Sequence, residues 1–472
     1  MSVIPIRDIT ATLRGAGLLD APPQAVGTPI QDTVSGACVD SRLARPGCLF
    51  VALKGERTDG HRFVDDAVQR GSVAALIAAS ELKAVRRSLY GSALLIPVAD
   101  PLRDLHAIAR EWRTRFPGLK RIGITGSNGK TTTKEMLASI LGSAGATVYS
   151  HGNYNSDIGL PLEVLRIRDF HAFGVFELGM NRPGEIGELA ELVEPEIAVI
   201  TNVGSAHIGM VGSRRAIAEE KKQITSRFTG SQTAVLPASG EFARFLATEI
   251  RGKVIRYGRS SAGVQRVEQR GLEGSTLYLK EGEVHLRLAG DHMVANALAA
   301  LTVARLLDVP FEAIRNGIES IGPMFGRTEV IEGRVTILQD CYNANPESMA
   351  TALELLERTA ASGRRIAILG AMKELGAESE HSHRALVQRA LSTNLDELWL
   401  YGDEFAAAEP PTSDSPVRLF HDHEWGEVVR FSREIRDGDT VLIKGSRSME
   451  LERLTPIIEE EAMAAAQGGA DG

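Results

Sequence analysis

At 472 residues the chain is too long for one hydrophobic core, since a single domain usually holds roughly 100–200 residues, and we expect three domains. A formal net charge of −8 argues against a nucleic-acid-binding role, because a phosphate backbone attracts a basic surface. The three cysteines include no CxxC pair, which argues against a disulfide framework or a zinc site and fits a reducing cytoplasm. No signal-peptide core and no run of 18 apolar residues occurs, so we expect a cytoplasmic protein without membrane insertion.

The first predicted domain, residues 1–98, contains short apolar strands, such as residues 47–53 and 73–77, with turn signals between them. The second predicted domain, residues 99–322, opens with a helical pattern over residues 102–115. It then alternates between strands and helices, which predicts a parallel sheet covered on both faces.

The second domain ends with a β-rich stretch at residues 253–288 and an Ala/Leu-rich helix at residues 293–307. The third predicted domain, residues 323–472, alternates between strands and helices again. Strand–helix alternation in two successive units predicts the α/β fold class.

A glycine-rich segment, G-I-T-G-S-N-G-K-T-T-T at residues 123–133, follows an apolar strand and opens a helix. Gly126 and Gly129 can turn tightly, so that backbone N–H groups approach a phosphate at the positive end of the new helix. Lys130 can neutralise the terminal phosphates, and the Thr131 hydroxyl can sit on Mg²⁺. The residues predicted to bind ATP here are Gly126, Ser127, Asn128, Gly129, Lys130, Thr131 and Thr132.

The spacing T-G-x-x-G-K-T differs from the pattern G-x-x-x-x-G-K-[ST], and the alternative interpretation is a glycine turn before an ordinary helix. A dinucleotide fold would instead need G-x-G-x-x-G without a lysine. The Lys-Thr pair therefore favours a triphosphate with a metal ion.

Two further strands of the central unit end in possible metal ligands. Glu177 closes the strand at residues 175–178, and His207 lies in the loop after the strand at residues 197–202. Ligands bind at the carboxyl ends of strands in open α/β sheets, so these loops should meet the phosphate loop. From position alone, a solvated carboxylate and a structural histidine are the alternatives.

A series of motifs in this order resembles the Mur ligases: T-G-S-N-G-K-T-T-T, G-N-Y-N-S-D-I-G-L-P, F-E-L-G-M-N, N-V-G-S-A-H, G-D-H-M-V-A-N-A-L-A-A and D-C-Y-N-A-N-P-E-S-M. The resemblance implies a small N-terminal α/β substrate domain, a central P-loop ATPase-like domain with a parallel sheet, and a C-terminal Rossmann-like α/β domain. The last motif is similar to the members that join D-alanyl-D-alanine to UDP-N-acetylmuramoyl-tripeptide.

The resemblance implies Mg²⁺ ligands at Thr131, Glu177 and His207. It also implies that Lys221 is carbamylated by CO₂ and holds a second Mg²⁺, with the neighbouring Lys222 as the alternative. The catalytic residues would be Lys130, His207 and Lys221.

Further contacts implied by the resemblance lie in all three domains. For the nucleotide they are Asn296 at the adenine, Arg327 at the phosphates and Asp340 at the ribose. For the other substrates they are Ser41, Arg42, Asn153, Asn155, Asn343, Asn345 and Lys444. Taken alone, each asparagine near residue 343 is equally consistent with a turn.

The implied reaction is ATP-dependent: a carboxylate is phosphorylated to an acyl phosphate and then attacked by the amine of D-alanyl-D-alanine. The enzyme is expected to be a cytoplasmic monomer of peptidoglycan-precursor synthesis. One alternative is a ligase adding a single amino acid, such as the diamino-acid-adding enzyme or a folate polyglutamate synthase. Others are a P-loop ATPase with partner-binding domains and a non-enzymatic nucleotide-binding module.

Overall fold

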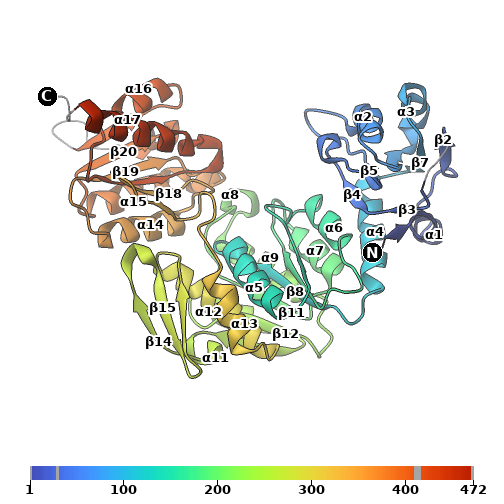
Figure 1. Cartoon of the computed structure of the whole chain (residues 1–472), viewed down its shortest axis with the longest axis horizontal. Helices are drawn as coiled ribbons and strands as arrows, with labels where there is room; N and C mark the ends of the chain where they lie inside the picture. The colour runs from blue at the N-terminus through green and yellow to red at the C-terminus, as the bar shows by residue number, and fades with distance from the viewer. Residues whose placement is uncertain (1–2, 28–30, 409–415, 469–472) are drawn as a thin grey trace.

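The computed structural model describes residues 3–27, 31–408 and 416–468, with side chains described as far as residue 461. Its larger sheets form three parts along the chain, and the blue N-terminal part and the orange-red C-terminal part lie on opposite sides of the middle part (Figure 1). The predicted α/β class is confirmed. No helix in the described ranges is long and apolar enough to cross a membrane.

The N-terminal part is built on a five-stranded sheet in which β4 to β7 run parallel and β2 runs antiparallel at the edge. The strands in spatial order are β2 (Gln24–Val26), β7 (Ala93–Val98), β6 (Ala74–Ala78), β5 (Cys48–Val51) and β4 (Gly36–Cys38). A second, two-stranded sheet pairs β1 (Ile4–Pro5) with β3 (Thr33–Val34). The helices are α1 (Ile6–Gly15), α2 (Val64–Gln69) and α3 (Leu82–Ser88).

Helix α4 (Pro101–Thr114) connects the N-terminal part to the middle part. Asp100 caps its N-terminus by accepting hydrogen bonds from the backbone of Leu102 and Arg103. One face is buried through residues such as Leu105 and Ile108, and it packs against α1 on one side and against α6 (Gly159–Val164) and α7 (Glu185–Val193) on the other.

The middle part contains a six-stranded, all-parallel sheet. The strands in spatial order are β13 (Lys253–Tyr257), β12 (Thr233–Pro237), β11 (Ile197–Ile200), β8 (Lys120–Thr125), β10 (Phe173–Glu177) and β9 (Thr147–Tyr149). The remaining helices on or near this sheet are α5 (Lys130–Ala144), α8 (Ile208–Val211), α9 (Arg214–Lys222), α10 (Ala243–Leu246), α11 (Arg259–Ala262), α12 (Asp291–Leu306) and α13 (Phe311–Glu319).

Helices cover both faces of this sheet, as strand–helix alternation predicts. Successive side chains of a strand point to opposite faces. Val175 and Val199 therefore pack with α5, α12 and α13, whereas Phe176 and Ile200 pack with the α4, α6 and α7 side. The β-rich stretch supplies β13 and a separate antiparallel sheet of β14 (Val264–Gln269), β15 (Ser275–Leu279) and β16 (Glu283–Leu286).

The C-terminal part has a second six-stranded sheet, parallel except for the edge strand β17. The strands in spatial order are β17 (Glu329–Ile331), β18 (Thr336–Asp340), β22 (Thr440–Lys444), β19 (Arg365–Gly370), β20 (Glu397–Tyr401) and β21 (Val417–Phe420). The helices are α14 (Pro346–Arg358), α15 (Ser379–Leu391), α16 (Trp425–Ser432) and α17 (Leu454–Gly468).

Candidate active site

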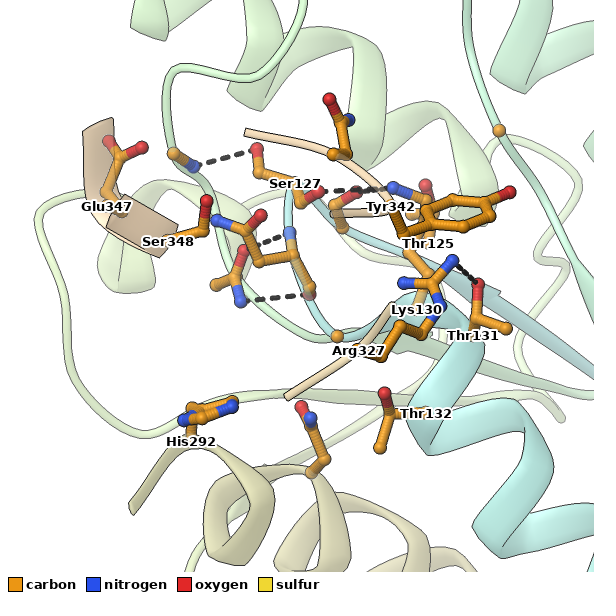
Figure 2. Close-up of a pocket in the computed structure, with 18 of the residues that line it drawn as sticks. Thr125, Ser127, Lys130, Thr131, Thr132, His292, Arg327, Tyr342, Glu347 and Ser348 are labelled. Atoms are coloured by element: carbon orange, nitrogen blue, oxygen red, sulfur yellow. Dashed lines mark hydrogen bonds between the residues drawn. The ribbon is translucent and has the colours of Figure 1, made fainter. Parts of the chain in front are cut away.

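A cavity of about 500 Å³ lies at the carboxyl ends of β8, β10 and β11. These strands are parallel neighbours in the order β10, β8, β11, so the loops that follow them meet at one edge of the sheet. Residues of β18, α12 and α14 also line the cavity, which places it between the middle and C-terminal parts. Figure 2 shows Lys130 and Thr131 of the middle part beside Arg327 and Tyr342 of the C-terminal part.

The loop between β8 and α5 has the tight backbone that a phosphate loop needs. Gly126 has a φ of 152° and Gly129 a φ of 78°, a region that side chains rarely adopt. A Cβ at Gly126 would collide with the Thr201 hydroxyl, and one at Gly129 with the Asn296 side-chain oxygen. Both positions therefore require glycine, and α5 begins at Lys130, directly after the turn.

Side chains of the loop after β11 hold the phosphate loop in shape. The Asn128 backbone N–H donates to Asn202 Oδ1 at 2.9 Å, and Asn202 Nδ2 donates to the Asn128 carbonyl at 3.0 Å. The Ser127 hydroxyl accepts a 2.8 Å hydrogen bond from the Gly204 backbone. These hydrogen bonds fix the shape of the loop.

Lys130 folds back over this loop and donates to the Gly126 carbonyl at 2.8 Å and to the Ser127 carbonyl at 3.2 Å. Burial lowers the pKa of Lys130 from its ordinary value, Glu177 opposes that shift, and Arg327 adds to it. Among the described residues the ammonium donates its hydrogen bonds to neutral carbonyls, so an incoming phosphate would offer it a better, charged partner.

Glu177 is 1% exposed and ends β10 at the cavity. Its Oε1 accepts a 2.8 Å hydrogen bond from Asn155, whereas its Oε2 is buried and has no partner in the described part of the chain. The Thr131 hydroxyl, at the start of α5, accepts a 3.0 Å hydrogen bond from Arg327. A buried carboxylate oxygen and a hydroxyl that line the same cavity are the hard oxygen ligands that Mg²⁺ prefers.

His207 also lines the cavity, and its Nδ1 lies 2.7 Å from Glu374 Oε2. Among the described residues, no group of three or more His, Cys, Asp and Glu side chains is placed to hold a metal ion. The set predicted from the sequence contains only two such side chains, together with a hydroxyl and a lysine. Thr131, Glu177 and His207 fit a hydrated Mg²⁺, which keeps several waters and needs few protein ligands.

The structure separates the two candidate lysines of α9. Lys221 is 1% exposed, lines the cavity, and has a weak 3.9 Å contact from its Nζ to the Met180 sulfur. Burial, with repulsion from Lys130, holds the pKa of Lys221 well below its usual range. Lys222 points elsewhere and donates to the Thr248 hydroxyl at 3.0 Å. Only Lys221 reaches the cavity.

Arg327 reaches the cavity from the C-terminal part, and its guanidinium lies 3.9 Å from the centre of the Tyr342 ring. Asp340 and Lys444 also line the cavity, but they are paired with each other at 2.7 Å. Lys444 further donates to the Asn343 carbonyl at 3.0 Å, so this buried lysine shapes the loop after β18.

Asn345 does not line the cavity; it caps α14 and forms a reciprocal amide pair with Asn128 of the phosphate loop. The two hydrogen bonds are 2.7 Å and 3.1 Å long. Asn296 lines the cavity from α12 and packs against Gly129. The C-terminal part therefore contacts the phosphate loop directly.

The remaining predicted residues fall into two places. Asn153 and Asn155 line the cavity, on the loop between β9 and α6. Ser41 and Arg42 lie outside it, in a 3-10 turn of the N-terminal part, where Arg42 pairs with Asp40 at 2.6 Å.

Several lining residues had no role in the sequence-based prediction. The main ones are Met180, Asn181, Asn202, His292, Tyr342 and Glu347. All six stand inside the quoted motifs, so their position in a motif was the available signal. Glu347 of α14 accepts hydrogen bonds from the backbone N–H and hydroxyl of Ser205, across the boundary between the two parts.

Three family models match the chain. They are the Mur ligase family catalytic domain over residues 33–113, the Mur ligase middle domain over residues 124–304, and the Mur ligase glutamate ligase domain over residues 326–447.

A UDP-N-acetylmuramoyl-tripeptide–D-alanyl-D-alanine ligase of Treponema pallidum is 39% identical, over 96% of this chain and 98% of that protein. A crystal structure of MurF from Acinetobacter baumannii superposes with a TM-score of 0.82 at 29% identity, covering 98% of this chain and 99% of that one. The MurF ligase of Thermotoga maritima in complex with ADP gives a TM-score of 0.76 at 29% identity, covering 92% of this chain and 99% of that one.

Proposed function

The chain belongs to the Mur ligase family, and we propose that it is the member that joins D-alanyl-D-alanine to UDP-N-acetylmuramoyl-tripeptide with ATP. The observation that carries this proposal is the single cavity in which Lys130, Glu177 and Lys221 meet Arg327 of the C-terminal part. Such a cavity supplies cations for a triphosphate and an acidic side chain for a metal ion in one place. The names of the near-full-length relatives direct the choice of substrates.

In the proposed reaction the phosphates of ATP lie on the loop before α5. Lys130 exchanges its two carbonyl partners for phosphate oxygens, and Arg327 approaches from the opposite side. A carboxylate oxygen of the tripeptide attacks the γ-phosphorus, and the bond from that phosphorus to the bridging oxygen of ADP breaks. The chain's task in this step is positioning and charge stabilisation.

The second step forms the amide bond. The amine of D-alanyl-D-alanine attacks the acyl carbon, loses a proton, and phosphate departs with its electron pair. Water would hydrolyse the acyl phosphate, so the reaction needs a covered site. The contacts of Asn345 and Glu347 with loops of the middle part support such cover, because they bring the C-terminal part onto the edge of the cavity.

We propose that Thr131, Glu177 and His207 hold Mg²⁺ with ATP. Bound there, Mg²⁺ would neutralise charge on the phosphate oxygens as a Lewis acid. Glu177 Oε2 has no hydrogen-bond partner within the described ranges, which supports this assignment, since a buried carboxylate oxygen without a partner is otherwise costly.

We further propose that Lys221 reacts with CO₂. Its lowered pKa favours the neutral amine, whose nitrogen can attack CO₂ to give a carbamate and one proton. The product would carry two oxygens at the cavity where the ammonium carried a positive charge. A second Mg²⁺ could then be held there by Lys221.

The domain limits near residues 98 and 322, a monomeric state and a cytoplasmic location are part of this proposal. The alternatives within the family are ligases that add a single amino acid, and outside it a P-loop ATPase with partner-binding domains.

Phosphate release by the purified chain tests the function. ATP, Mg²⁺, UDP-N-acetylmuramoyl-tripeptide and D-alanyl-D-alanine are supplied together, and then each is omitted in turn. We expect phosphate release only with all four, and a product whose mass equals the two joined substrates minus water. Release without the dipeptide, at an undiminished rate, would favour the ATPase, and activity with a free diamino acid on UDP-muramyl dipeptide would favour the other ligase.

A further inference from the structure

A loop of the C-terminal part, residues 371–376, lies against α8 of the middle part, directly after His207. Figure 1 shows α8 beside the orange-red C-terminal part. The contact is a backbone one: the Gly209 N–H donates to the Glu374 carbonyl at 2.9 Å. This contact lies outside the cavity described above, because neither Gly209 nor Glu374 lines it.

Two glycines allow this close approach. A Cβ at Gly209 would lie 2.6 Å from the Gly376 nitrogen and 2.7 Å from the Glu374 carbonyl oxygen. A Cβ at Gly376 would lie 2.8 Å from the Gly209 Cα. The two backbones therefore pack directly on each other.

Two residues in the left-handed region present their side chains across this contact. His207 has a φ of 64° and Glu374 a φ of 65°, which is unfavourable for residues with a Cβ. Their side chains meet at 2.7 Å between His207 Nδ1 and Glu374 Oε2. Backbone strain at both partners of one short side-chain contact indicates that the surrounding structure maintains this pair.

The 371–376 loop is itself held firmly from within the C-terminal part. The Met372 N–H donates to the buried His383 Nε2 at 3.0 Å, and the Lys373 N–H donates to the Ser446 hydroxyl at 2.8 Å. The position of Glu374 is therefore tied to the C-terminal part and moves with it.

The geometry assigns Glu374 as a positioning residue for His207. A carboxylate only accepts hydrogen bonds, so an oxygen 2.7 Å from Nδ1 favours the tautomer with its proton on Nδ1, which would leave Nε2 to bind a metal ion. A histidine that binds a metal commonly donates its other ring N–H to such an acceptor. Docking of the C-terminal part would thus complete the metal site of the middle part; this inference rests on the proposed role of His207 as a metal ligand.

Mn²⁺ binding to the full chain with a non-hydrolysable ATP analogue tests the assignment without turnover. We expect Glu374→Ala to weaken Mn²⁺ binding by about 10–100-fold, the usual effect of removing such a partner. Glu374→Gln should retain most of the affinity, because its amide oxygen still accepts from Nδ1. Glu378→Ala is the matched control, since Glu378 is an exposed acid of the adjacent turn without a described side-chain partner.

Gly209→Ala gives a second, independent test. It leaves both side chains in place but forces the two backbones apart, so it should weaken Mn²⁺ binding in the same direction as Glu374→Ala. Circular dichroism of each variant checks that the fold is kept.

Equal Mn²⁺ affinity in wild type and Glu374→Ala would overturn the assignment. A wild-type chain that bound no Mn²⁺ would remove the metal-ligand role of His207 and the assignment with it. The proposed function fails separately if the wild-type chain releases no phosphate with the muramyl substrates. The assignment of Glu374 would still hold in that case, provided that Mn²⁺ binding depends on Glu374.

Discussion

Replacing Lys221 by methionine should stabilise the ligand-free protein and abolish ligation. The lysine is 1% exposed, and its one hydrogen-bond partner in the described part of the chain is the Met180 sulfur at 3.9 Å. Methionine has similar volume and no charge to desolvate. Replacing poorly compensated buried charge by a well-packed apolar side chain stabilises a protein by about 1–4 kcal/mol.

The gain in the free energy of unfolding of Lys221→Met over wild type should decrease as the pH rises. Burial lowers the pKa of Lys221 in the folded protein, so between that value and the unfolded value of about 10.4 the unfolded chain binds more protons. The penalty for burying the lysine is therefore relieved as pH rises, by at most about 1.4 kcal/mol per pH unit. The advantage of Lys221→Met over wild type should therefore shrink as the pH rises toward the unfolded-state pKa of about 10.4.

Calorimetric melting in bicarbonate-free buffer without ATP or Mg²⁺ measures the stability, and phosphate release measures the activity. Lys222→Met is the matched control: this side chain is 16% exposed and bonded to Thr248, so no stability gain and little loss of activity are expected. A destabilised Lys221→Met protein, or one that still ligates at a normal rate, would refute the reasoning.

The other predictions concern binding roles. Lys130→Ala should abolish ligation while changing the free energy of unfolding by only about 1 kcal/mol, since it loses two hydrogen bonds to carbonyls; a collapse of the melting temperature would instead indicate a structural role. Asn296→Ala and Arg327→Ala should each raise the KM for ATP more than the KM for the muramyl peptide; unchanged ATP kinetics in both would contradict the nucleotide assignment. The double variant Ser41→Ala with Arg42→Ala should raise the KM for the UDP-linked substrate and leave that for ATP unaltered, because these residues lie away from the cavity; an unaffected KM for that substrate would place its binding site elsewhere.

Local sequence patterns predicted most of the sheet that carries the site. The strands expected at residues 175–178 and 197–202 overlap β10 (Phe173–Glu177) and β11 (Ile197–Ile200), and the helix expected at residues 293–307 agrees with α12 (Asp291–Leu306). The phosphate loop was predictable because its glycines, lysine and threonine act within one turn. The helix expected over residues 102–115 agrees with α4 (Pro101–Thr114).

Contacts between distant segments were not predictable in this way. The pairing of Asp340 with Lys444 joins neighbouring strands that lie 104 positions apart in the chain, so each looked like a separate ligand contact. Glu374 lies in a loop whose sequence carries no metal-ligand spacing, and its meeting with His207 depends on how the C-terminal part docks. Helix α13 and strand β21 were also not predicted from the sequence.

Because of helix α4, the junction between the N-terminal and middle parts is more rigid than the junction between the middle and C-terminal parts. The helix begins two residues after β7, and it packs on both α1 and the α6–α7 side. Trp112 Nε1 donates to the Ile167 carbonyl at 3.1 Å. Arg115, the residue that follows the helix, pairs with Asp8 of α1 at 2.6 Å. A rotation at this junction would expose the buried apolar surface of α4 to water, so α4 connects the N-terminal and middle parts rigidly. The other junction, from Ser320 to Thr328, contains no helix and includes Gly326 at a φ of 63°, so it can turn as a hinge. When the molecule opens, the C-terminal part should therefore rotate, while the N-terminal part should keep its orientation relative to the phosphate loop.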